Sequence, residues 1–240
     1  MGVRLLTALV AATLACNGLA QTLLIDDFEA YAVGAEPPKN AWDHIKGNAF
    51  DGDPPAMIMD DPLRPWNKVY AHSGQRLYGS EDSFTDFTWE FDWMVDADVN
   101  TSVAWRIETP TTYYYFTRRR RGKILWIFRL NGNSTLLNEG DDEWASVPNK
   151  WYTTQISSFG QNHTVKMKDW DPLRRFADVD SIASVENGDV LAGPIGFWGA
   201  NGGTLYVDNV HVYGAENPGF YFAVEPAGKL VSTWASIKQR

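Results

Sequence analysis

Glu90 and Asp92 stand two positions apart in the segment Glu90-Phe91-Asp92-Trp93-Met94. Successive side chains of a β-strand point to opposite faces, so this spacing places both carboxylates on one face. Paired carboxyl groups about 5–5.5 Å apart can act as nucleophile and acid/base in retaining glycoside hydrolysis. Glu90 and Asp92 are therefore the candidate catalytic residues if the chain is a hydrolase.

A sheet must hold these carboxylates, and the segment from Asp86 to Leu130 predicts four consecutive strands. Hydrophobic and polar residues alternate with a period of two, and turn-forming residues separate the strands. The expected strands are Phe87–Val95, Thr101–Glu108, Tyr113–Arg119 and Lys123–Leu130. We expect one face of this sheet to be core and the other to gather the ligand-binding residues Glu90, Asp92, Arg106, Tyr114 or Tyr115, and Arg129.

A second catalytic arrangement, suited to a polysaccharide lyase, needs Arg, Gln or His, and Tyr on one face. Arg106, Tyr115, Gln155 and His163 supply these residue types. Large β-proteins generally contain such residues, so the pattern has low specificity. The four histidines lack the spacing of metal ligands. No nucleophile elbow or phosphate-binding loop is present in the sequence.

The segment Tyr113–Arg121 places four consecutive aromatic residues and a threonine before four arginines in an otherwise acidic chain. Alternation along a strand sends Tyr115 and Arg119 to the same face. Tyrosine rings can stack on sugars, and guanidinium groups pair bidentately with carboxylate or sulfate. We therefore expect an anionic polysaccharide, uronate-rich or sulfated, to bind here through Tyr115, Arg119 and Arg129. The alternative is that the arginines form surface ion pairs with acidic loops.

The composition narrows the class of protein. The 240 residues include 21 basic and 30 acidic residues, for a formal net charge of −9. This balance argues against general nucleic-acid binding and against binding to anionic membrane surfaces. Eleven Trp, ten Tyr and twelve Phe favour strands and also offer flat surfaces to ligands. The length is ample for one all-β domain with a large core.

Residues 1–20 have the features of a secretory signal peptide: a basic start at Arg4, an apolar run, and small residues before a cleavage point after Ala20. Cleavage there removes Cys16, the only cysteine of the sequence. A lipid anchor on Cys16 is disfavoured, because Thr13 stands where a lipobox has Leu. We expect a secreted, extracellular or periplasmic protein without disulfides.

Short strand candidates separated by turn residues continue as far as Tyr213. They include Trp42–Ile45, Gln75–Tyr78 and a hairpin formed by Lys150–Phe159 and His163–Asp169. The segment Trp170–Gly188 is expected to be irregular. About a dozen short strands predict an all-β fold, with two antiparallel sheets in a sandwich or a barrel.

We assign residues 21–214 to this single domain and residues 215–240 to a C-terminal tail. In the tail, Leu230, Trp234 and Ile237 have helical spacing, so we expect a short helix there. No stretch after the signal peptide is apolar enough to span a bilayer.

Several segments, in the expected order along the chain, resemble the concanavalin A-like lectin/glucanase superfamily. The resemblance implies a jelly-roll of two antiparallel sheets and a bias toward glycans, but it does not select a function. The segments are Asp26–Gly34 for the first strand, Lys150–Tyr152 with Gly160 and Val165–Met167 for a late hairpin, and Gly193–Phe197 and Tyr206–Val210 for the last two strands.

Family 16 glucanases of this superfamily carry Glu-x-Asp-x-(x)-Glu on a central strand. Glu90 and Asp92 match its first two positions. The second Glu is absent, because Trp93, Met94 and Val95 stand where it is needed. The broken motif favours a binding domain over a hydrolase.

The resemblance also implies a structural Ca²⁺ ion bound by Glu29, by the carbonyl of Gly74 or a neighbour, and by Asp208. Oxygen ligands suit Ca²⁺, and an ion bound only by the folded state stabilises a domain without disulfides. The alternative is that Glu29 and Asp208 are ordinary surface or capping carboxylates.

The sequence leaves the class of function open. The first class is a secreted, monomeric, non-catalytic domain that binds a polysaccharide on its concave sheet. The second is a secreted glycan-cleaving enzyme, hydrolase or lyase, that uses the same face. The third is a structural or adhesive surface domain without a glycan ligand.

Overall fold

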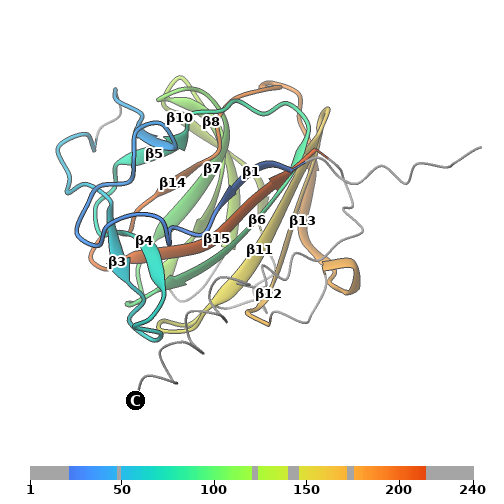
Figure 1. Ribbon diagram of the computed structural model, residues 1–240. Helices are drawn as coiled ribbons and strands as arrows, with labels where there is room; N and C mark the ends of the chain where they lie inside the picture. Colours follow the sequence, from blue (N-terminus) through green and yellow to red (C-terminus); the bar gives the residue numbers. More distant parts are fainter. Residues whose placement is uncertain (1–21, 48–49, 121–123, 140–145, 172–175, 215–240) are drawn as a thin grey trace, which may run out of the picture.

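Two antiparallel β-sheets packed face to face make up the fold (Figure 1). The structure is a computed structural model that describes residues 22–47, 50–120, 124–139, 146–171 and 176–214. The strands are β1 (Thr22–Asp26), β2 (Trp42–His44), β3 (Met57–Asp60), β4 (Lys68–His72), β5 (Leu77–Ser80), β6 (Phe87–Val95), β7 (Thr101–Thr109), β8 (Thr112–Arg118), β9 (Ile124–Leu130), β10 (Asn133–Glu139), β11 (Tyr152–Phe159), β12 (Asn162–Asp169), β13 (Ser181–Glu186), β14 (Gly196–Trp198) and β15 (Leu205–Tyr213).

The larger sheet, sheet A, has eight strands in the order β13-β12-β11-β6-β15-β4-β3, with β1 also paired to β15. The second sheet, sheet B, has seven strands in the order β10-β9-β8-β7-β14-β5-β2. Every pairing is antiparallel or a short antiparallel bridge. The predicted all-β sandwich is therefore confirmed.

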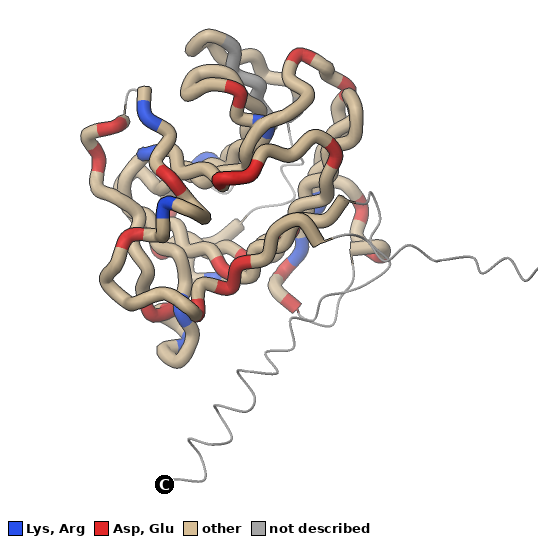
Figure 2. The backbone as a smooth tube through the Cα atoms, turned by 45° about the horizontal axis from the view of Figure 1, so that its top comes forward, with Lys and Arg blue, Asp and Glu red and all other residues tan. Residues whose placement is uncertain are grey.

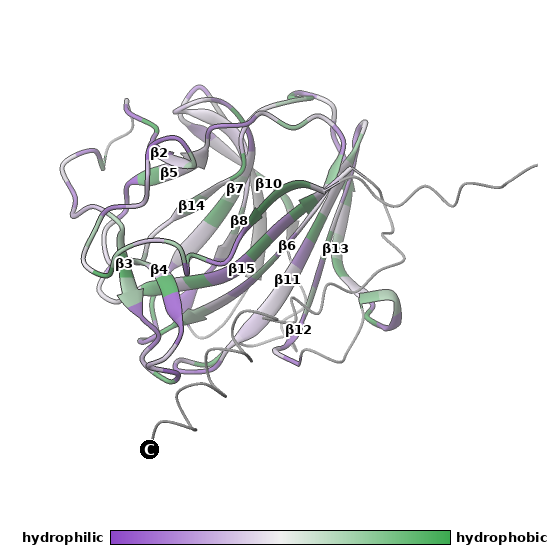
Figure 3. Cartoon of the chain, viewed as in Figure 1, coloured by the Kyte–Doolittle hydropathy of each residue, from purple (hydrophilic) through white to green (hydrophobic). Residues whose placement is uncertain are grey.

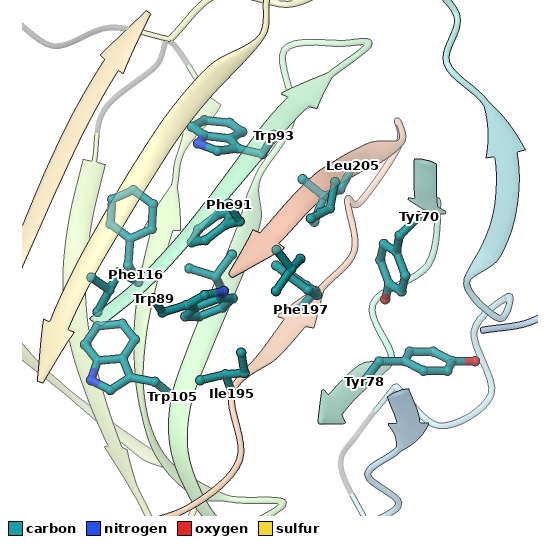
Figure 4. Packing of buried hydrophobic residues seen from close by; sticks show 14 of the residues in the cluster. Tyr70, Tyr78, Trp89, Phe91, Trp93, Trp105, Phe116, Ile195, Phe197 and Leu205 are labelled. Atoms are coloured by element: carbon teal, nitrogen blue, oxygen red, sulfur yellow. The ribbon is translucent and has the colours of Figure 1, made fainter. Parts of the chain in front are cut away.

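The core between the sheets is dense in aromatic rings, as Figure 4 shows. Trp89 and Phe91 of β6 point into it from sheet A, and Phe197 of β14 meets them from sheet B. The Trp89 and Phe91 ring centroids lie 4.5 Å apart, and both rings lie within 6 Å of Phe197, at 5.3 and 5.7 Å. Burial of such large rings supplies most of the stabilisation of a sandwich of this kind.

The prediction that β6, β7, β8 and β9 form one sheet is wrong. Their boundaries agree closely with the expected ones, but β6 belongs to sheet A, whereas β7, β8 and β9 belong to sheet B. The chain crosses between the layers after Val95. Alternation shows which residues of a strand face the core, and both layers share that core. It does not show which layer a strand joins.

Two further strands were not expected. β13 lies within the segment predicted to be irregular, as does a short 3₁₀ helix at Phe176–Asp178. β10 pairs with β9 at the edge of sheet B. Asn133, Ser134 and Thr135 of β10 are exposed, so the start of this strand carries little of the hydrophobic alternation that identifies a strand.

β15 lies between β6 and β4 and completes sheet A. Hydrophobic and hydrophilic positions follow one another along it in Figure 3. A bulge between Asp208 and His211 shifts its register against β6, and Asn209 takes a positive φ of 50° there. The bulge sends both Asp208 and His211 to the side opposite the core residue Val210.

Acidic and basic residues are spread over many strands and loops, as Figure 2 shows. Among the described residues, no helix is long and apolar enough to cross a membrane. The predicted signal peptide of residues 1–20 and the predicted tail helix of residues 215–240 lie outside the described residues.

Candidate functional site

Glu90 lies on the outer face of sheet A, because its neighbours Trp89 and Phe91 face the core. Its two carboxylate oxygens are both engaged. The Gln155 side-chain amide donates to Oε1 at 2.6 Å, and the Tyr213 hydroxyl donates to Oε2 at 2.9 Å. Burial raises the pKa of Glu90, and these two hydrogen bonds offset part of the rise.

Asp92 lies on the same face and is only 6% exposed. Thr153 donates to its Oδ1 at 2.6 Å, while the Trp170 indole and the Asn209 amide donate to Oδ2 at 2.9 and 2.8 Å. Burial raises the pKa of Asp92, and the three hydrogen bonds oppose that rise. All four carboxylate oxygens of Glu90 and Asp92 therefore bind protein donors, which fits a structural role better than contact with substrate.

Arg106 does not share this face. It lies in sheet B with a positive φ of 48°, at an irregularity in the pairing of β7 with β8. Its guanidinium is buried and donates to the carbonyls of Thr85, Gly160 and Val190 at 2.7–3.1 Å. Arg106 therefore ties loops together at one end of the sandwich.

Tyr115 lies in β8 of sheet B, half-buried, with its ring 5.8 Å from the ring of Tyr113. The first arginine of the basic cluster beyond it is not on the surface. Arg118 is buried and binds Asp98 at 3.0 Å and the Ser146 hydroxyl at 2.6 Å. Arg119 is exposed. Arg121 lies outside the described residues, and so does the side chain of Arg129.

The residues expected of a lyase do not converge. Gln155 is on the outer face of sheet A, bound to Glu90. His163 faces the interior, where Nδ1 lies 2.9 Å from the Ser158 hydroxyl and Nε2 lies 2.9 Å from the Asn187 carbonyl. Tyr115 belongs to the opposite sheet. Sequence alone cannot separate such residues, since each occupies an ordinary strand position.

A polar pocket of about 220 Å³ lies at one edge of the sandwich. It is formed around β2, the outermost strand of sheet B, and its neighbour β5. We call this site the edge pocket. Trp42 and Tyr78 are buried at its base, and His44 and Arg76 are half-buried. The remaining lining residues are Glu36, Pro37, Lys39, Asp43 and Lys46.

The base of the edge pocket is held rigidly. The Trp42 indole donates to Asp26 at 2.9 Å, and Tyr31 donates to the same carboxylate at 2.9 Å. Asp26 belongs to the segment that resembles the first strand of the superfamily. Burial raises the pKa of Asp26, and the bond from Trp42 opposes the rise most. The rings of His44 and Tyr78 lie 5.7 Å apart.

The edge pocket brings three basic residues together in an acidic chain. Lys39, Lys46 and Arg76 line it with the carboxylates of Glu36 and Asp43, and the Asp51 carboxylate lies 3.0 Å from His44 Nε2. The Arg76 Nε is buried, and no described residue accepts a hydrogen bond from it. An unsatisfied buried donor is costly. The arrangement can therefore bind an anionic, ring-shaped ligand.

Comparison with known proteins bears on the fold. No protein-family profile matches the chain, and no curated protein matches its sequence. Among solved structures, the carbohydrate-binding module CBM66 from Bacillus subtilis superposes with a TM-score of 0.54 at 15% identity, over 72% of this chain and 96% of that chain. A protein from Parabacteroides distasonis, provisionally described as a glycosyl hydrolase, gives 0.50 at 12% identity, over 73% and 88%.

The chain shares its jelly-roll fold, a sandwich of two antiparallel sheets, with these structures. At these identities the likeness concerns the fold.

The Ca²⁺ ion that the resemblance to the concanavalin A-like superfamily implies needs ligands that lie close together in space. Glu29 Oε1 accepts from the Lys68 backbone N–H at 3.0 Å, and Asp208 Oδ2 accepts from Asn67 at 2.8 Å, so both lie near the start of β4. Gly74 follows the end of β4, where an added Cβ would meet the Pro54 carbonyl. Glu29, Gly74 and Asp208 therefore do not fit one ion as a set.

A lysine ammonium lies beside the backbone of Glu29, one of the predicted calcium ligands. Lys68 Nζ donates to the carbonyl oxygens of Glu29 and Tyr31, at 2.7 Å each. Within the described ranges, no group of three or more His, Cys, Asp or Glu side chains is placed to hold a metal.

Sequence reasoning missed the edge pocket of this jelly-roll. It predicted strands at Trp42–Ile45 and Gln75–Tyr78 but assigned them no role. The pocket exists because β2 pairs with β5, so that His44 stands opposite Tyr78. The available signal was a basic residue two positions from an aromatic one in each segment, His44 after Trp42 and Arg76 before Tyr78. Only the pairing of the two strands brings these residues into one site.

Proposed function

We propose that this chain is a secreted, non-catalytic domain that binds an anionic polysaccharide in the edge pocket. The observation that carries the proposal is a pocket of about 220 Å³ that combines fixed aromatic rings with Lys39, Lys46 and Arg76. Ligand sites commonly pair an apolar wall with a few placed polar groups. The shared fold of the carbohydrate-binding module CBM66 gives an analogy for glycan binding at the level of the fold.

The proposed contact is between Arg76 and the carboxylate or sulfate of a sugar residue. The Arg76 Nε is a buried donor without a protein acceptor among the described residues. A guanidinium can pair bidentately with such an anion. The half-buried His44 offers a ring surface above the buried Tyr78, and the exposed Lys39 and Lys46 add positive charge at the rim. The volume suits one sugar unit, so we expect recognition of a chain end or a single side residue.

Affinity electrophoresis tests this proposal. Gels containing alginate, a sulfated galactan or neutral laminarin are run with the wild type, Arg76→Gln and the control Arg120→Ala. Arg120 is an exposed cation far along the chain from the pocket residues. We expect the acidic gels to retain the wild type, and Arg76→Gln to lose most of that retention. Added salt should weaken the retention, because charge pairs are screened over about 8–10 Å at physiological ionic strength.

Two results would contradict the proposal. Equal retention by laminarin and the acidic gels would remove the anionic specificity. Equal losses in Arg76→Gln and Arg120→Ala would mean that retention follows net charge or the basic segment Tyr113–Arg121, and not the pocket. Assay of the same polysaccharides for released reducing or unsaturated ends tests the enzyme alternative, which requires release.

A further inference from the structure

We infer that Trp170 is a stacking platform for a pyranose ring, on sheet A and separate from the edge pocket on sheet B. Trp170 directly follows β12 and is 40% exposed. Its indole N–H donates to Asp92 at 2.9 Å, and the Arg64 guanidinium carbon lies 5.1 Å from its ring centroid. One edge and one face of the indole are thus occupied, and the opposite face accounts for the exposure. The inference rests on the proposed glycan binding.

The groups that hold the indole include a buried carboxylate, whose burial is unfavourable in free energy. Asp92 is a buried carboxylate, and burial of a charged group is unfavourable unless hydrogen bonds compensate. Arg64 lies between two indoles, 4.8 Å from the Trp151 ring centroid and 5.1 Å from that of Trp170. A ring fixed in this way loses little conformational entropy when a ligand stacks on it. The exposed face of Trp170 is therefore preorganised to stack against a flat ligand.

A charged group lies against the ring. The Arg64 guanidinium contacts the indole, and the Arg64 side chain is 22% exposed. Lys150 and Asp169 form an ion pair of 2.8 Å at the neighbouring strand ends, but Lys150 Nζ lies 5.4 Å from the Tyr152 ring centroid, on the core side of sheet A. A sugar has a C–H face that packs on an aromatic ring and hydroxyl groups that bind charged side chains. A pyranose unit of a polysaccharide matches this combination.

The competing explanation is that Trp170 only shields Asp92 from water. Both explanations predict that Trp170→Ala lowers the melting temperature, because Asp92 loses a donor. They differ in binding. A shield has no effect on the affinity of the folded protein, whereas a platform contributes affinity that added salt does not screen.

The test uses the full chain in gels containing laminarin, alginate or the sulfated galactan, at low and high salt. Trp170→Ala is compared with Trp170→Phe, which keeps a flat ring, and with Leu136→Ala, an exposed apolar residue of β10 on sheet B. We expect Trp170→Ala to weaken binding roughly two- to tenfold at both salt concentrations. Trp170→Phe should retain part of the affinity, and Leu136→Ala all of it. Circular dichroism below the melting temperature confirms that each variant is folded.

The outcomes separate this inference from the proposed function. If the wild type is retained but folded Trp170→Ala is retained equally in every gel, the platform is refuted and the edge pocket stands. If no gel retains the wild type, the proposed function fails and the platform with it. A loss in Trp170→Ala alone, with Arg76→Gln unchanged, supports the platform and refutes the pocket.

Discussion

The hydroxyl of Tyr213 donates a hydrogen bond of 2.9 Å to Oε2 of Glu90, which joins β15 to the centre of β6. This contact, with the bond from Gln155, makes Glu90 a structural acceptor. Glu90→Gln keeps both bonds if the new amide oxygen accepts from Gln155 and the new NH₂ donates to Tyr213. We expect Glu90→Gln to be as stable as the wild type or more so, and Glu90→Ala to lose about 1–3 kcal/mol in urea unfolding.

The difference in stability between Glu90→Gln and the wild type should depend on pH, and its direction follows from the pKa of Glu90. Burial raises the pKa of Glu90 above its ordinary value of 4.5, so the unfolded chain loses this proton first as the pH rises. The ionised carboxylate therefore reduces stability above its folded-state pKa. The advantage of Glu90→Gln should grow from about pH 4.5 upward. If Glu90→Gln instead abolishes a measured glycosidase activity without unfolding the protein, the enzyme alternative is correct.

Because three histidines are buried, we expect the free energy of unfolding to fall in acid. Burial lowers the pKa of His72, His163 and His211 from 6.5 to about 4. Between these values the unfolded chain binds more protons than the folded one, so stability falls as the pH drops from 6.5 toward 4. Urea unfolding at a series of pH values measures the slope. His163→Gln should flatten it, and an unchanged slope in that variant would contradict the prediction for His163.

Lys68 provides a test of the cation expected near Glu29. Its ammonium donates to the backbone carbonyls of Glu29 and Tyr31, so it places a positive charge beside the backbone of Glu29. We expect Lys68→Met to lose about 1–3 kcal/mol of unfolding free energy, because two partly buried acceptors lose their donor. EDTA should leave the melting midpoint of the wild type unchanged. A lower midpoint in EDTA would establish a bound ion, and Asp208→Ala would then locate it.

Substitution of the arginines that follow β8 shows whether the edge pocket or the basic segment Tyr113–Arg121 contributes more to binding. Arg119 is exposed, and single exposed ion pairs contribute little in solution. We expect the Arg119→Ala/Arg121→Ala double variant to reduce retention by alginate about twofold, less than Arg76→Gln does. The same affinity gels measure both. A larger loss in the double variant would show that the principal site is not the edge pocket but the outer face of sheet B, where Tyr115 lies.

The sequence predicted local structure well and spatial grouping poorly. The boundaries of β6 and of the β11–β12 hairpin follow from alternation and turn residues, which are local properties. The expected single binding face fails because Glu90 and Tyr115 belong to different layers. The edge pocket depends on the pairing of β2 with β5, and the role of Asp92 depends on a contact with Trp170, 78 residues away in sequence. Long-range pairing of this kind leaves no periodic trace in the chain.

The position of β15 in sheet A constrains how the protein is made. β15 is the last described strand, yet it lies between β6 on one side and β4 and β1 on the other. A ribosome therefore releases β1, β4 and β6 well before the strand that joins them exists. Until residues 205–213 emerge, the edges of β4 and β6 present unpaired backbone groups to other chains. Sheet A closes only after residues 205–213 have been made, so efficient production requires that the incomplete chain be kept from aggregating.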